Sequence, residues 1–254
     1  MISLNILLTT LNNTVDQCIY FKEIILLYYV ARRSLRLRRL TRLKLILIIQ
    51  IAFEVYLFYK SNIKKAMTTG YRIEEQSALY YVTLSIVGWI DVFSRQRYRD
   101  IVIESLNYCQ QKMGLQVFAY VIMTNHIHLI VNSPMGNLSA TIREFKKFTS
   151  KEIIRSIQSD VESRRDWMLE LFQKYASQHK RNKTYQFWTH DNHAVLLYSN
   201  SFIESKLTYL HENPVRAGWV AHPEDYLYSS ATNYAGKTSL LGVILLDIPW
   251  KTYH

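Results

Sequence analysis

Residues 121–131 place the tightest constraint on how this chain folds. They read VIMTNHIHLIV, a run of apolar and β-branched residues that contains two histidines. Such a run predicts a β-strand, in which the side chains at positions i and i+2 point to the same face. We therefore expect His126 and His128 to project together, while Ile127 and Leu129 point into the core.

Two imidazoles on one face of a rigid strand supply half of a divalent-metal site. The H-x-H spacing alone is a weak signal, because one core histidine beside one solvated histidine gives the same pattern. A catalytic metal site therefore needs a further ligand and a reacting group from elsewhere in the chain.

The first 66 residues differ in composition from the rest of the chain. They contain no Gly and no Pro, although a domain of that length normally needs turns. They hold eleven Lys and Arg against three Asp and Glu, a net charge of +8, whereas residues 67–254 carry only +3. We therefore expect an atypical extension over residues 1–66 and one compact domain over residues 67–254.

Three interpretations of residues 1–66 stay open. The basic stretch at 31–44 and the apolar stretch at 45–59 fit an amphipathic extension that binds a membrane surface or nucleic acid, or else a helical appendage. The third interpretation is that translation starts at Met67 and the segment is not made. The apolar stretch is shorter than the roughly twenty residues that a membrane-spanning helix needs.

Cysteine content and charge limit the class of protein. Cys18 and Cys109 give neither a disulfide framework nor a cysteine metal site, so we expect a protein of the reducing cytoplasm. The net charge of +11 indicates a polyanionic partner. Because residues 67–254 carry little of this charge, a nucleic-acid surface there must be a local patch.

The patterns of residues 67–254 predict alternating strands and helices. Runs of β-branched and aromatic residues predict strands, and apolar residues at helical spacing between capping residues predict helices. The expected elements are a strand at 78–87, a helix at 95–113 ended by Gly114, strands at 115–123 and 126–132, a helix at 137–157 capped by Asn137, a strand at 185–189, a helix at 201–212 and a last strand-like segment at 240–250. This order is typical of the α+β ferredoxin-like fold, an antiparallel sheet with helices on one face and the other face open for a site.

The helix at 201–212 and the turn after it offer the missing groups. Tyr209 and Asn213 are four residues apart and share a helix face. Asn213 would add an oxygen ligand to the two histidines, and such mixed ligands suit Mg²⁺ or Mn²⁺. Tyr209 would be a nucleophile, because a nearby metal favours the phenolate. Spacing alone does not single out this residue among nineteen tyrosines.

Three stretches together resemble a known family: VIMTNHIHLIV, FWTHDNHAVLLYSN and YLHENPVRAGWVAHPEDYLYSSATNY. They are similar to the REP-associated branch of the single-tyrosine HUH transposases, over about residues 67–250. The resemblance implies that His126 and His128 bind the divalent ion, that Asn213 completes its shell and that Tyr209 is the nucleophile.

The sequence departs from the family pattern in two places. Thr124 stands where relatives commonly have proline, which should affect the turn and not the chemistry. Residues 1–66 have no counterpart in the family.

The family's activity is cleavage and rejoining of single-stranded or hairpin DNA, metal-dependent and through a 5′-phosphotyrosine intermediate. The resemblance therefore implies a DNA transposase with Mg²⁺ or Mn²⁺, without a small-molecule cofactor, acting as a monomer or homodimer. The basic residues expected to bind DNA are Arg143, Lys146, Lys147, Lys151 and Arg216. For the four on the 137–157 helix, simple solvation is the alternative, and Arg216 could equally stabilise the end of its own helix.

Two other functions remain open. One is a non-catalytic protein of the same fold that binds hairpin DNA or RNA, and the other is an RNA-binding module with incidental histidines. Among the other histidines, we expect His190 and His193 to form a structural turn near the site. His211 should face away from Tyr209 on the helix and should not be a ligand.

Overall fold

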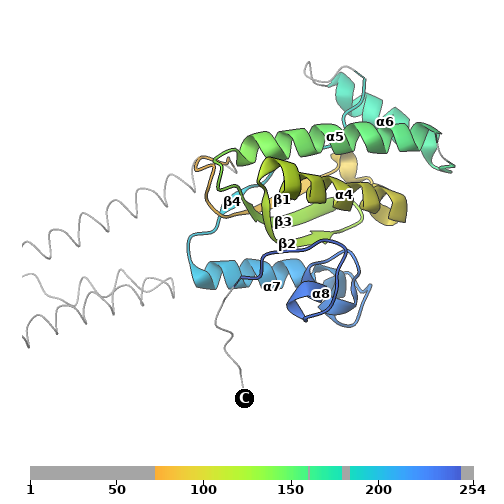
Figure 1. The fold of residues 1–254 in the computed structure, drawn as a ribbon. Coiled ribbons are helices and arrows are strands. Elements are labelled where there is room, and N and C mark those ends of the chain that lie inside the picture. The colour runs from red at the N-terminus through yellow and green to blue at the C-terminus, as the bar shows by residue number, and fades with distance from the viewer. Residues whose placement is uncertain (1–71, 160, 179–183, 247–254) are drawn as a thin grey trace, which may run out of the picture. The chain divides into compact units, whose positions relative to one another are not determined.

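The structure is a computed structural model that describes residues 72–246 except 160 and 179–183 (Figure 1). The expected extension at 1–66 lies outside the described residues. The elements are β1 (Tyr80–Ser85), η1 (Val87–Trp89), η2 (Val92–Ser94), α4 (Gln96–Met113), β2 (Gln116–Ile122), β3 (His126–Asn132), α5 (Leu138–Ser159), α6 (Arg165–Ser177), β4 (Val195–Leu196), α7 (Asn200–Arg216), η3 (Pro223–Asp225) and α8 (Ala231–Tyr234).

One antiparallel sheet organises the described part of the chain. Its strand order is β2-β3-β1-β4, and β1 pairs with both β3 and β4. Helices α4 and α5 cover one face of the sheet, and α7 lies across the other (Figure 1). The succession β1-α4-β2-β3-α5-β4 confirms the predicted α+β ferredoxin-like fold.

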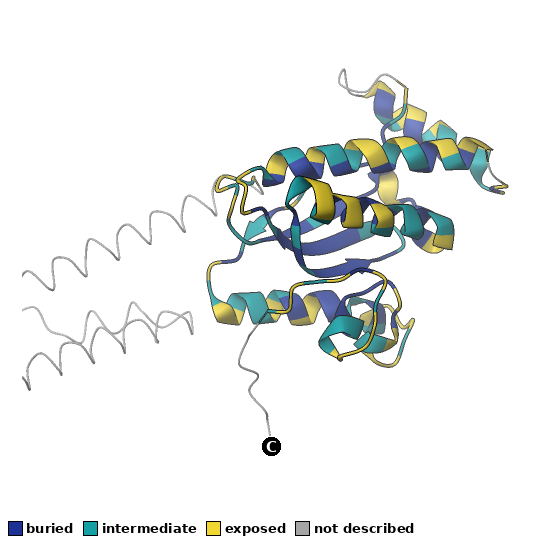
Figure 2. Ribbon diagram, in the orientation of Figure 1, coloured by how far each residue is buried: buried dark blue, intermediate teal, exposed yellow. Residues whose placement is uncertain are grey.

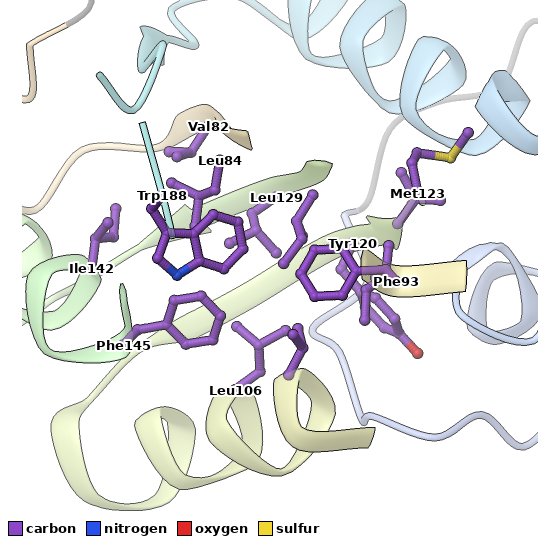
Figure 3. Close-up of a cluster of buried hydrophobic side chains, with 14 of the residues drawn as sticks. Val82, Leu84, Phe93, Leu106, Tyr120, Met123, Leu129, Ile142, Phe145 and Trp188 are labelled. Atoms are coloured by element: carbon purple, nitrogen blue, oxygen red, sulfur yellow. The ribbon is translucent and has the colours of Figure 1, made fainter. Parts of the chain in front are cut away.

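The hydrophobic core lies between the sheet and the helices α4 and α5. Strand and helix faces that are buried in Figure 2 meet there, because alternate residues of each strand point to this side. Figure 3 shows side chains of this core, which come from the three long strands, from both helices and from the segment before β4: Val82, Leu84, Leu106, Tyr120, Leu129, Ile142, Phe145 and Trp188. The buried indole N–H of Trp188 donates to Thr149 Oγ1 at 3.0 Å, so this polar group is satisfied.

The helix ends follow from local chemistry. Gly114 ends α4 in the left-handed conformation, with φ of 68°, and its N–H donates to the Cys109 carbonyl. Asn137 precedes α5 as expected, but the Ser139 N–H in the first turn is bound by the side-chain oxygen of Gln76 at 2.8 Å. A residue distant in sequence therefore provides a cap that the local pattern assigned to Asn137.

The edge strand differs from the prediction. The segment 185–189 forms only an isolated bridge, between Trp188 and Ile86, because β1 ends at Ser85 and the chain turns into η1. The strand β4 is instead Val195–Leu196, which pairs with the opposite end of β1.

Two further boundaries are corrected. Helix α7 runs to Arg216, past the expected end at 212, and includes Pro214. A proline in the last turn removes only one backbone donor, and the Ala217 N–H still donates to the Asn213 carbonyl at 2.9 Å. The stretch expected as a strand at 240–250 has no strand in its described part. Within residues 72–246, apart from the gaps, no helix has the length and apolar character to cross a membrane.

Replacing Gly114 with alanine should destabilise the fold by roughly 1–2 kcal/mol, the cost of a left-handed conformation for a residue with a Cβ. The new Cβ would also clash with the Met135 sulfur and displace that side chain. Urea denaturation measures the free energy of unfolding. Gly242→Ala is the matched control, because Gly242 has no positive φ and open space around it. Equal stability of the two variants would contradict the assignment of Gly114 as a cap.

Candidate active site

The pairing of β1 with β3 places the two histidines. Thr83 lies opposite His128, and Ser85 lies opposite His126. The two imidazole rings are on one face, with their centroids 4.7 Å apart. The shared face that the H-x-H spacing predicted is therefore present, and it is the face that α7 covers.

Each imidazole is oriented through its Nδ1 atom. His128 Nδ1 is hydrogen-bonded to Thr83 Oγ1 at 2.9 Å, and His126 Nδ1 to Asn125 Oδ1 at 2.6 Å. Since an amide oxygen can only accept, His126 carries its proton on Nδ1 and leaves Nε2 as a lone pair. Partners of this kind on the distal nitrogen are typical of metal-binding histidines.

Burial keeps both histidines neutral at physiological pH. It lowers the pKa of His126 to about 4. It lowers the pKa of His128 to about 3, with smaller contributions from the charges of His126 and Lys206. The neutral imidazole is the form that binds a metal, so neither histidine has to lose a proton first.

Helix α7 is anchored to the sheet by a buried polar contact. His211 Nε2 is hydrogen-bonded to Ser230 Oγ at 2.9 Å, and the same hydroxyl accepts from the Tyr120 N–H of β2, also at 2.9 Å. His211 is buried and stacks edge-on against Tyr234, with ring centroids 5.1 Å apart. The side chain therefore faces away from Tyr209, as the helical spacing predicted.

With α7 in this place, Tyr209 lies beside the histidines of its own chain. Its ring centroid is 5.8 Å from that of His128, and 41% of the residue is exposed. Tyr81 of β1 lies next to both, stacked on His128 at 5.3 Å and edge-on to Tyr209 at 6.5 Å. Unlike Tyr209, Tyr81 is buried, and burial raises the pKa of its phenol well above the ordinary value.

Polar and basic groups of α7 surround Tyr209. The Asn213 amide N–H donates to the Tyr209 carbonyl at 2.7 Å, which leaves Oδ1 as an acceptor one turn along the helix. The Arg216 guanidinium lies 5.0 Å from the centre of the Tyr209 ring, and Lys206 Nζ lies 5.9 Å from it. Tyr209 is thus held between two cations.

The donor atoms fit a hard or borderline divalent ion. Two neutral imidazoles and one amide oxygen are the ligand types that Mn²⁺ accepts readily and that leave positions open for water or phosphate. In the described part of the chain, no group of three or more His, Cys, Asp or Glu side chains is placed to hold a metal.

The basic residues expected to bind DNA lie in three different environments. Arg216 lies at the site. Arg143, Lys147 and Lys151 are exposed on α5, over the opposite face of the sheet (Figure 1). Lys146 departs from the expected basic face, because it is half-buried and its ammonium is hydrogen-bonded within the chain.

Lys146 Nζ donates to the Thr189 carbonyl at 2.8 Å and to Asn192 Oδ1 at 2.7 Å, and burial lowers its pKa to about 8. It therefore fastens α5 to the turn at 189–193, whose Asn192 carbonyl accepts from the Thr83 N–H at 3.0 Å. This turn contains His190 and His193 and lies beside the strand that supports the site.

The sequence pattern did not single out several residues of the site: Tyr81, Thr83, Trp89, Asn125 and Lys206. Lys206 precedes Tyr209 by three residues, so helical spacing alone places the two on one face. Thr83 and Tyr81 reach the histidines through the register of two strands that are far apart in sequence. No local spacing carries that information.

Comparison with known proteins relates the chain to one family. A family profile described as "Transposase IS200 like" matches residues 90–205. Among solved structures, the chain is similar to a REP-associated tyrosine transposase bound to a REP hairpin, with a TM-score of 0.46 and 15% identity over 72% of this chain and 98% of that chain. A search of curated proteins gave no match. The family profile agrees with the predicted resemblance over residues 90–205, a span that includes the histidine pair and ends before Tyr209.

His211 should make stability depend on pH. Burial lowers its pKa to about 4, whereas an unfolded histidine titrates near 6.5. Between these values only the unfolded chain binds the proton, so stability should fall as the pH falls, by up to about 1.4 kcal/mol per pH unit from this group. Urea denaturation of the metal-free protein at pH 7, 5.5 and 4.5 measures the slope. In His211→Gln the slope should be smaller, and identical slopes would contradict a neutral buried His211.

Proposed function

We propose that this chain, a relative of the IS200-like transposases, cuts and rejoins single-stranded or hairpin DNA with Tyr209 as its nucleophile. One observation carries the proposal: the ring centroid of the exposed Tyr209 lies 5.8 Å from that of His128, a neutral and oriented histidine of the H-x-H pair in the same chain. The H-x-H pair offers ligand nitrogens, and the tyrosine offers an oxygen that a substrate can reach.

The ligands of the metal would be His126, His128 and Asn213. A bound Mg²⁺ or Mn²⁺ would polarise a non-bridging phosphate oxygen and offset the charge of the transition state. The protein's own contribution is to hold the histidines neutral and turned with Nε2 outward, through Thr83 and Asn125.

The chemistry at phosphorus is an exchange of two ester bonds. The Tyr209 oxygen, having lost its proton, attacks the scissile phosphorus in line with the 3′ oxygen. The bond from phosphorus to the Tyr209 oxygen forms as the bond to the 3′ oxygen breaks, and the 3′ oxygen takes up a proton. The products are a 5′-phosphotyrosine and a free 3′-hydroxyl. Attack by a 3′-hydroxyl reverses the step and joins strands without an external energy source.

Lys206 and Arg216 support this role for Tyr209. Both cations lie within 6 Å of its ring centre, so they attract the phosphate of a substrate to the phenol. Tyr81 is the competing tyrosine, but it is buried at 5% exposure and its pKa is raised by that burial, which disfavours it as a nucleophile.

DNA would contact two surfaces. Arg216 lies where the scissile phosphate would bind. Arg143, Lys147 and Lys151 lie across the sheet on α5, so any contact from them would be with phosphates distant from the cleaved bond. A single chain holds Tyr209 and both histidines, so a monomer suffices for the reaction.

Tyr209→Phe should abolish a covalent protein–DNA adduct. The assay uses the full chain, labelled hairpin oligonucleotides from the DNA flanking the gene, and Mg²⁺ or Mn²⁺, with a denaturing gel as readout. Tyr81→Phe is the matched control and should still form the adduct. An adduct that survives Tyr209→Phe but disappears in Tyr81→Phe would make Tyr81 the nucleophile. Tight binding with no adduct in the unmodified protein would instead support the non-catalytic DNA-binding function.

Thr83→Val should weaken metal binding while leaving the fold intact. The change keeps the shape of the side chain but removes the hydroxyl that orients His128, and loss of such a partner typically costs about 10–100-fold in metal affinity. Isothermal titration calorimetry with Mn²⁺ measures the dissociation constant of the metal. Ser77→Ala is a control that also removes a hydroxyl. The Ser77 hydroxyl is exposed and donates to the neighbouring Glu75 carboxylate, so its loss should not change the affinity for Mn²⁺. An unchanged affinity for Mn²⁺ in Thr83→Val would argue against binding at His128.

A further inference from the structure

Trp89 is an exposed aromatic residue at the edge of the candidate active site. It is 65% exposed, and its ring lies edge-on to His126 with the centroids 6.0 Å apart. Single exposed apolar residues are common on protein surfaces and need no explanation by themselves. The place of Trp89 and the way in which its backbone is held set it apart.

The backbone of η1 is strained at Trp89. Its φ is 55°, in the left-handed region that bulky residues rarely adopt, and the preceding Gly88 has φ of 63°. The turn also packs tightly on α6, since a Cβ at Gly88 would lie 2.8 Å from the Tyr175 ring. Tertiary contacts therefore hold the backbone at Trp89 in a conformation that local preferences disfavour.

The same turn is joined to His126 through one side chain. Asn125 Nδ2 donates to the Trp89 carbonyl at 3.4 Å, while Asn125 Oδ1 accepts from His126 Nδ1 at 2.6 Å. Just beyond the turn, the Arg164 guanidinium bonds to Asp91 at 2.8 Å and to Ser94 at 3.1 Å. These contacts hold the Trp89 backbone next to the histidine, and the exposed surface of the indole stays available to a ligand.

We infer that Trp89 is a stacking platform for an unpaired base next to the scissile phosphate. The inference rests on the proposed function, because it takes a DNA phosphate to bind at the histidines. A ring 6.0 Å from His126 is within the reach of one nucleotide from such a phosphate. Every base has a flat face, so a rigid indole binds the strand beside the cleaved bond without requiring one base identity.

Three variants test the platform in a binding assay that needs no chemistry. Trp89→Asn removes the ring and keeps a residue that tolerates the left-handed conformation, whereas Trp89→Phe keeps a ring. Trp167→Asn removes another exposed tryptophan, 49% exposed on α6. Each is made in the full chain with Tyr209→Phe, which removes the proposed nucleophile. Affinity for flanking hairpin oligonucleotides is then measured by fluorescence anisotropy with Mn²⁺ present.

Trp89→Asn should weaken DNA binding about tenfold or more, the size of one lost base stack, and Trp89→Phe should lose much less. Trp167→Asn should bind like the parent. A single abasic nucleotide is then moved along the unpaired strand. At one position the abasic nucleotide should weaken binding to the parent about as much as Trp89→Asn does. At that position it should not weaken the binding of Trp89→Asn further, because the missing base and the missing indole remove the same stack.

The outcomes separate this inference from the catalytic proposal. Two results would overturn the platform while leaving Tyr209 chemistry intact. One is equal DNA affinity in the parent and Trp89→Asn. The other is an abasic nucleotide that, at every position, weakens the binding of Trp89→Asn as much as that of the parent. Loss of binding in Trp89→Asn, in a protein that forms no covalent adduct, would support the platform and reject the chemistry. No measurable binding of any flanking oligonucleotide would overturn both.

Discussion

The antiparallel pairing of β1 with β3 fixes the positions of the groups in the candidate site. It sets Thr83 opposite His128 and brings Tyr81 onto the His128 ring. A slip by one residue would turn the histidines into the core and expose Ile127, Leu129 and Val131, which are buried. The hydrophobic core on one face of the sheet therefore holds the register that the polar face needs. A mutation in that core would disturb the site without touching it.

The two faces of the sheet have different chemistry. Under α4 and α5 the sheet is packed with apolar side chains (Figure 3). Under α7 it carries the histidines, and the helix is fastened there by the His211–Ser230 hydrogen bond to the backbone of β2. The buried His211–Ser230 hydrogen bond requires a defined distance and angle, whereas apolar packing alone tolerates small shifts of a helix. It accounts for how Tyr209 is held at a defined distance from His128.

Supporting contacts also come from segments that the fold inserts between its regular elements. The amide of Asn125 joins His126 to the strained turn at Trp89, and α6 packs on that turn through Tyr175. Lys146 ties α5 to the turn at 189–193 that borders β1. A shell of this kind limits the motion of the imidazoles, which is what a metal site requires of its ligands.

The sequence by itself determined the features that depend on spacing within one element. The alternation along β3 put His126 and His128 on one face, and the helical period put Tyr209 on the same side as Asn213 and opposite His211. The motifs indicated a resemblance to a family whose profile matches residues 90–205. Three features were decided only by the tertiary structure: the hydrogen bonds of Lys146 to the turn at 189–193, the edge strand at 195–196 and the partnership of Thr83 with His128. Each of these depends on contacts between segments distant along the chain, and local periodicity records which face a side chain takes but not what packs against it.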